Sequence, residues 1–99
     1  MNNVRINGNN AVINVAGRFD LVKSMEVEQE LKIALNQHGC TGITLDLAQT
    51  KFIDSSANRL FKKSRDMVGN ENFKVINVNA PAVLKALQTA KLDKIFHIL

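Results

Sequence analysis

The residues with the clearest chemical potential are three in a row, Asp54, Ser55 and Ser56. Side-chain oxygens of Asp and Ser cap helices by accepting hydrogen bonds from the first backbone N–H groups. The same N–H groups, together with the positive end of the helix dipole, also favour a bound phosphate. The serines are therefore either caps of a helix that begins here or acceptors of a phosphoryl group.

Other residues that could support catalysis or metal binding are scattered along the chain. His38 and His97 are far apart, and neither has a metal-ligand spacing to Cys40. Ser55 has no candidate His base with an orienting acid, which a nucleophilic serine requires. No Gly-rich phosphate loop follows a predicted strand. We therefore expect a protein that is not an enzyme and that uses no metal or cofactor.

Basic residues follow the two serines at helical spacing. Arg59, Lys62, Lys63 and Asp66 lie at i, i+3, i+4 and i+7, so they share the helix face that looks away from the core. Ser55 lies four residues before Arg59 and leads into this stripe. Two interpretations remain, a solvated helix face and a docking face for an acidic protein partner. Nucleic acid is not expected, because aromatic residues and a recognition helix are missing from the pattern.

The elements that position these residues follow from apolar periodicity and turn residues. Ser24 is expected to cap the first helix and Gly39 to end it, and residues 17–20 are expected to form a loop. A third helix begins around Pro81 and buries a stripe of four apolar residues, namely Val83, Leu84, Leu87 and Ala90. The expected strands are residues 4–6, 11–15, 43–47 and 73–78, with a short last strand within 92–99, and the second helix runs from Asp54 to about Val68.

This order of elements predicts an α/β fold. Strands that alternate with helices imply right-handed crossovers and a largely parallel sheet. The residues Asn7 and Gly8 favour an opening antiparallel hairpin. The expected architecture is a mixed, mostly parallel sheet of four to five strands with three or more helices packed on it.

Composition narrows the class of protein. The 99 residues correspond to one domain, and 45% hydrophobic residues are enough to build a core. A single Cys favours a reducing compartment. No apolar run approaches the ~20 residues that span a bilayer, and the first residues do not resemble a signal peptide. We therefore expect a cytoplasmic protein without a membrane span. The net charge of +4 affects solubility and encounter rates rather than identifying a function.

The stretch from Leu45 to Ser56, Leu-Asp-Leu-Ala-Gln-Thr-Lys-Phe-Ile-Asp-Ser-Ser, resembles the signature of STAS domains, typified by bacterial anti-sigma factor antagonists. In that signature an apolar strand is followed by Asp-Ser-(Ser/Thr)-Gly and an apolar helix. Gly17-Arg18-Phe19-Asp20 is similar to the family's Gly-Glu-(apolar)-Asp loop, and the segment 92–96 is similar to its closing motif. The resemblance covers nearly the whole chain, 1–99, as a single STAS domain.

The resemblance implies a phosphorylation switch in a bacterial regulator. It maps the phosphorylated serine to Ser55, with Ser56 as the alternative, and the neighbouring acids to Asp54 and Asp20. The implied partners are a serine kinase of the anti-sigma factor type and a PP2C-type phosphatase. A phosphate carries about −1.5 to −2 charge at pH 7 and would disturb a surface that docks a neutral hydroxyl. The expected partner-binding residues are Ser55, Ser56, Asn58, Arg59, Lys62, Lys63 and Arg18.

The chain departs from the family pattern at three positions. Ala57 replaces the Gly that follows the serines, Asn58 replaces an apolar residue, and Arg18 replaces a Glu. The alternative function is a STAS scaffold subunit of a larger complex, stressosome-like or transporter-associated, without turnover of phosphate.

Overall fold

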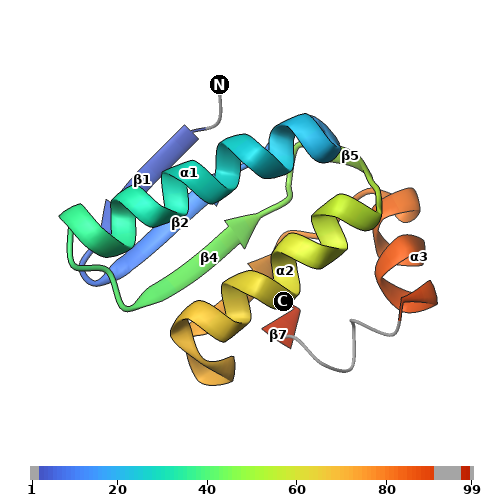
Figure 1. Cartoon of the computed structure of the whole chain (residues 1–99). Coiled ribbons are helices and arrows are strands. Elements are labelled where there is room, and N and C mark those ends of the chain that lie inside the picture. Colours follow the sequence, from blue (N-terminus) through green and yellow to red (C-terminus); the bar gives the residue numbers. More distant parts are fainter. Residues whose placement is uncertain (1–2, 91–96, 99) are drawn as a thin grey trace.

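In the computed structural model, which describes residues 3–90 and 97–98, the chain opens with the predicted hairpin (Figure 1). Strand β1 (Asn3–Asn7) pairs antiparallel with β2 (Asn10–Asn14). Gly8 in the connecting turn has a φ of +63°, a left-handed conformation that glycine adopts without a steric penalty.

Three further strands extend the sheet in parallel, in the order β1-β2-β4-β6-β7. They are β4 (Gly42–Asp46), β6 (Phe73–Ile76) and β7 (His97–Ile98). The prediction of a mixed, mostly parallel sheet is therefore confirmed. Of the predicted last strand, β7 accounts for residues 97 and 98, whereas 92–96 and 99 lie outside the described residues.

A second, two-stranded sheet was not predicted. Residues 17–20 were expected to form a loop, but Gly17–Phe19 form β3, which pairs in parallel with β5 (Thr50–Ile53). Each strand is too short to show a clear alternation of apolar and polar residues. Their pairing depends on contacts between segments about 30 residues apart, which local sequence patterns do not reveal.

Helices α1 (Leu21–Gln37) and α2 (Ser55–Val68) lie side by side on one face of the large sheet (Figure 1). Helix α3 (Pro81–Thr89) packs near β5, and a 3₁₀ turn, η1 (Asn70–Asn72), connects α2 to β6. The three predicted helices are therefore present.

The start of the first helix was predicted wrongly. Asp20, not Ser24, is the N-cap of α1, so the helix begins four residues earlier than expected. Ser24 is buried inside the helix, and its hydroxyl donates a hydrogen bond to the Asp20 carbonyl oxygen at 2.8 Å. Ser and Asp share the chemistry of a cap, so the choice depended on the unrecognised strand β3 that ends just before Asp20.

The buried stripe of α3 is also narrower than predicted. Val83 and Leu87 are fully buried, as expected, and Ala86 packs against the core. Leu84 is 39% exposed and Ala90 is exposed, contrary to the prediction. Val83, Ala86 and Leu87 fall within about 100° of one another around the helix axis, and Leu84 lies outside that arc.

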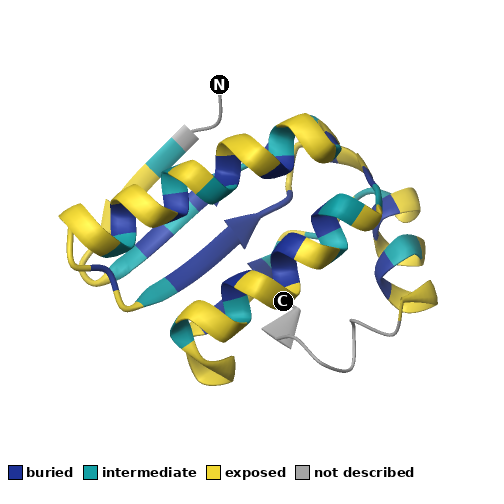
Figure 2. Cartoon of the chain, in the orientation of Figure 1, coloured by how far each residue is buried: buried dark blue, intermediate teal, exposed yellow. Residues whose placement is uncertain are grey.

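The main core lies between the large sheet and helices α1 and α2, with the outer helix faces exposed (Figure 2). The ring of Phe61 on α2 meets the ring of Phe19 edge to face, with centroids 5.5 Å apart. Full burial of such side chains contributes about 1.5–3 kcal/mol each. The strands, the residues directly after them and helix α1 contribute the following fully buried residues: Ile13, Val15, Ile43, Leu45, Leu47, Val75, Val27 and Leu31.

Candidate functional site

Asp20 and Asp54, the two acids expected beside the serines, lie at the starts of neighbouring helices. Phe19 at the end of β3 pairs with Ile53 at the end of β5. The backbone N–H of Asp54 also donates to the Phe19 carbonyl oxygen at 3.3 Å. Because the two strands are parallel, Asp20 and Asp54 leave the same edge of the small sheet. The small sheet therefore sets the N-termini of α1 and α2 side by side.

Each of these aspartates caps its own helix. One carboxylate oxygen of Asp54 accepts hydrogen bonds from the N–H of Ser56 at 2.8 Å and of Ala57 at 3.2 Å. The carboxylate of Asp20 accepts one from the N–H of Lys23 at 3.1 Å. The interpretation of Ser56 as a cap is wrong, because Asp54 already accepts the hydrogen bonds from these amides. Ser55 and Ser56 are the first two residues inside α2, and neither hydroxyl serves as its cap.

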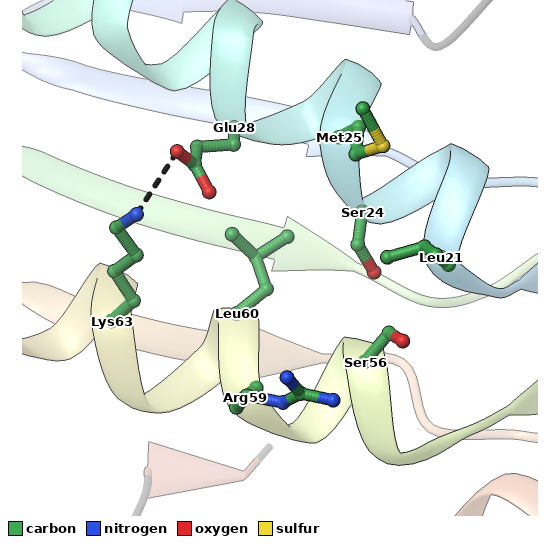
Figure 3. Close-up of a pocket in the computed structure, with 8 residues that line it drawn as sticks. All are labelled: Leu21, Ser24, Met25, Glu28, Ser56, Arg59, Leu60 and Lys63. Carbon is green, nitrogen blue, oxygen red and sulfur yellow. Dashed lines mark hydrogen bonds and ion pairs between the residues drawn. The ribbon is translucent and has the colours of Figure 1, made fainter.

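The two serines open onto different surfaces although they are adjacent. Ser55 is exposed and lines a hollow beside α3. Ser56 is half-buried and faces α1 (Figure 3). The surface beside Ser55, here called the α2–α3 hollow, is lined by Ile53, Asp54, Ser55, Asn58, Ala82, Lys85, Ala86, Thr89 and Ala90. The surface beside Ser56, here called the α1–α2 groove, has a volume of about 280 Å³ and is lined by Leu21, Ser24, Met25, Glu28, Ser56, Arg59, Leu60 and Lys63.

The predicted basic stripe is divided between these surroundings. Arg59 and Lys63 line the α1–α2 groove, and the guanidinium of Arg59 extends along α2 toward Ser56 (Figure 3). Lys62 is exposed and does not line the groove. Asn58, one turn after Ser55, lines the α2–α3 hollow instead. Two residues of the stripe, Arg59 and Lys63, therefore border the groove, and Lys62 lies outside it.

Arg18 lies apart from the other expected partner-binding residues, on the small sheet. It is exposed, and its guanidinium lies 4.7 Å from the centroid of the Phe52 ring. Such a cation–π contact contributes about 0.5–1 kcal/mol at an exposed position. Arg18 thus covers part of an apolar ring on β5.

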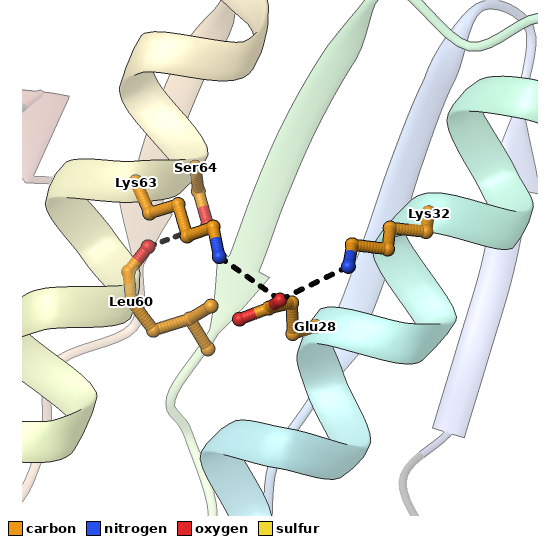
Figure 4. A network of polar contacts seen from close by, with 5 residues as sticks. All are labelled: Glu28, Lys32, Leu60, Lys63 and Ser64. Carbon is orange, nitrogen blue, oxygen red and sulfur yellow. Dashed lines mark hydrogen bonds and ion pairs between the residues drawn. The ribbon is translucent and has the colours of Figure 1, made fainter.

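Glu28 of α1 joins the two helices through its carboxylate (Figure 4). One oxygen lies 3.0 Å from the Lys63 ammonium and 3.2 Å from the Lys32 ammonium. These bonds, first to Lys63 and then to Lys32, hold the pKa of Glu28 below its usual value. The pair with Lys32 follows from its i,i+4 spacing within α1. The bridge to Lys63 depends instead on how α1 and α2 pack.

Sequence reasoning also missed an apolar patch next to the site. Leu21, Val22 and Met25 in the first turns of α1 are 58%, 64% and 62% exposed. The signal was the apolar pair directly after Asp20, which cannot both face the core at the start of a helix. Exposed apolar residues grouped in this way are typical of surfaces that contact another protein.

A polar cluster that the sequence did not indicate supports the far end of β4. The Asp46 carboxylate, in a residue only 8% exposed, accepts hydrogen bonds from the N–H of Ala48 at 3.0 Å and the amide of Asn77 at 3.1 Å. The amide of Asn14 donates to the other oxygen at 3.3 Å. These bonds tie β2, β4 and the chain after β6 together just before the connection to β5.

Within residues 3–90 and 97–98, no group of three or more His, Cys, Asp or Glu side chains is arranged to hold a metal. In the same part of the chain, no helix is both long and apolar enough to cross a membrane.

Comparison with known proteins agrees with this architecture. A search of curated protein sequences found no match. Among solved structures, the chain is similar to an anti-sigma factor antagonist from Mycobacterium paratuberculosis, with 23% identity, a TM-score of 0.82, and coverage of 99% of this chain and 83% of that one. It is also similar to SpoIIAA of Bacillus in its phosphorylated form, with 18% identity, a TM-score of 0.73, and coverage of 100% and 91%.

The unphosphorylated form of SpoIIAA, described as an anti-sigma factor antagonist, gives 18% identity, a TM-score of 0.71, and coverage of 100% and 87%. At these identities the likeness establishes the fold. The model of the STAS domain family matches residues 2–99, nearly the whole chain. The chain therefore belongs to the STAS domain family.

Proposed function

We propose that this protein is a non-enzymatic bacterial regulator whose binding to a protein partner is switched by phosphorylation of Ser55. The observation that carries the proposal is the division of roles at the start of α2. Asp54 caps the helix, so the Ser55 hydroxyl is not needed as a cap. Ser55 is exposed and therefore accessible to another protein. The description of similar structures as anti-sigma factor antagonists, one of them phosphorylated, supports the same role.

The partners that fit are a serine kinase of the anti-sigma factor type and a PP2C-type phosphatase, acting in the cytoplasm. The unmodified partner-binding surface comprises the apolar patch of α1 together with the start of α2. A phosphate on Ser55 adds about −1.5 to −2 charge at pH 7 to this surface, at the start of α2. Desolvating that charge against an apolar partner surface is costly, so the complex dissociates.

The experiment combines phosphosite mapping with capture of partners from the native cell. Wild type, Ser55→Ala and Ser55→Asp serve as baits, and Thr41→Asp is a matched control that adds the same charge at an exposed hydroxyl residue before β4. We expect wild type, Ser55→Ala and Thr41→Asp to retain the same partner and Ser55→Asp to lose it. Phosphopeptides should include Ser55.

Two results would contradict the proposal. Full binding by Ser55→Asp would show that charge at this residue does not control the complex. A stable stoichiometric complex, together with no phosphate on Ser55 in native cells, would instead favour the scaffold function, in which the same surface serves assembly without phosphate turnover.

A further inference from the structure

We propose that Ser56 is a second phosphorylation site, distinct from Ser55, whose phosphate is bound within the same molecule by Arg59 in the α1–α2 groove. This inference goes beyond the proposed function and does not depend on phosphorylation of Ser55. It rests on the different surroundings of the two adjacent hydroxyls.

The first argument is geometric. Ser56, Arg59 and Lys63 all line the α1–α2 groove. Residues three apart on a helix have Cβ atoms about 5–6 Å apart, so a phosphate on Ser56 is within reach of the Arg59 guanidinium. That guanidinium already extends toward Ser56 (Figure 3). No ion pair joins Arg59 to another residue in the described part of the chain.

The second argument is charge balance. In and beside the groove, the Glu28 carboxylate contacts the Lys32 and Lys63 ammonium groups, and Arg59 lies nearby (Figure 4). The groove lining itself holds one carboxylate, Glu28, and two positive groups, Arg59 and Lys63, which leaves one positive charge in excess. A phosphoserine carries about −1.5 to −2 charge at pH 7, and this positive excess attracts it.

The surroundings of Ser55 lack this excess. The α2–α3 hollow contains one carboxylate, Asp54, and one ammonium group, Lys85. These two charges are equal and opposite, so the hollow has no net positive charge to bind a phosphate. A phosphate on Ser55 therefore stays exposed to solvent. The backbone at the helix start does not provide a receptor for either phosphate, because Asp54 already accepts from the N–H of Ser56 and Ala57.

The modification itself is an ordinary phosphoryl transfer from ATP by a serine kinase. The Ser56 hydroxyl oxygen forms a bond to the γ-phosphorus, and the bond from that phosphorus to the β,γ-bridging oxygen breaks. ADP leaves, and the hydroxyl proton passes to the kinase's base. Because Ser56 is half-buried, the kinase must reach it from the open side of the groove.

The experiment places phosphoserine at position 55 or 56 of the full chain and titrates each phosphate by ³¹P NMR. An adjacent cation favours the dianion, so we expect the second pKa of the phosphate at position 56 to be about half to one pH unit below that at position 55. Arg59→Gln should abolish most of this difference. Lys62→Gln, which removes the same charge from α2 outside the groove, should leave it intact.

The proposal is overturned if both phosphates titrate alike, if Arg59→Gln has no more effect than Lys62→Gln, or if the protein unfolds with phosphate at position 56 but not at position 55. In native cells, the tryptic peptide 52–59 contains both serines, and its fragment ions separate them. Phosphate found on Ser55 alone would sustain the proposed function and overturn this inference. Phosphate on Ser56 alone would do the reverse.

Discussion

Replacement of Asp54 by Ala tests whether this carboxylate, and not either serine, caps α2. The substitution removes the acceptor of two hydrogen bonds, from the N–H of Ser56 at 2.8 Å and of Ala57 at 3.2 Å. Loss of a cap typically costs about 1–2 kcal/mol of stability. For a domain of this size, each kcal/mol lowers Tm by about 4–8 °C, so we expect a fall of roughly 4–16 °C.

Three matched variants separate the cap from its charge and from the serines. Asp54→Asn retains an oxygen that can accept the same bonds, so it should lose only the interaction of the charge with the helix dipole, about 0.3–1 kcal/mol. Ser55→Ala and Ser56→Ala should change Tm little, because neither hydroxyl caps the helix.

The assay is thermal and urea unfolding followed by circular dichroism, with the free energy of unfolding compared among the four variants. If Ser56→Ala destabilises the protein as much as Asp54→Ala, the serine carries the cap and the division of roles at this helix start is wrong. Equal losses in Asp54→Ala and Asp54→Asn would show that charge, not the accepting oxygen, is what matters.

Three further predictions concern the rest of the chain. Asp46→Ala leaves three donors without their carboxylate acceptor, and we expect a loss of about 2–4 kcal/mol in urea unfolding, with Asp46→Asn losing less. Because the folded-state pKa of Glu28 is lowered, its stabilisation is present above its ordinary value of 4.5 and is lost as pH falls toward the lowered pKa. Glu28→Gln should therefore destabilise the protein at pH 7 and lose this effect in acid, and an effect that is equal at both pH values would contradict the ion pairs. Gly69→Ala should cost of order 1–3 kcal/mol, because the backbone there has a φ of +90°, and an unchanged Tm would contradict that geometry.

The parts of this fold that the sequence predicted are those encoded by local patterns. The apolar stripe of α2 places Ala57, Leu60 and Phe61 in the core, as the helical period indicates. The hairpin turn was likewise recognisable from Gly8. Such features depend on neighbours in the sequence, so they can be predicted without knowledge of the tertiary structure.

The parts that the sequence did not reveal depend on segments that meet only in space. Gly17–Phe19 becomes a strand because it finds Thr50–Ile53, and that pairing decides that Asp20 begins α1. The bridge from Glu28 to Lys63 requires the packing of α1 on α2. Helix packing also places Ser55 and Ser56 on different surfaces. The spacing of the basic residues along α2 could not predict which serine lies on which surface.

The parallel pairing of β3 with β5 has a consequence for how the molecule responds to changes in chain length. Both helix starts are fixed by the same few backbone hydrogen bonds, so the effect of a residue inserted within β5 would not stay local. It would shift Asp54 relative to Asp20 and move one helix start along the other. Insertions should therefore be tolerated in the turn between β1 and β2 but not here, and a library of single-residue insertions scored by folding would map this difference along the chain.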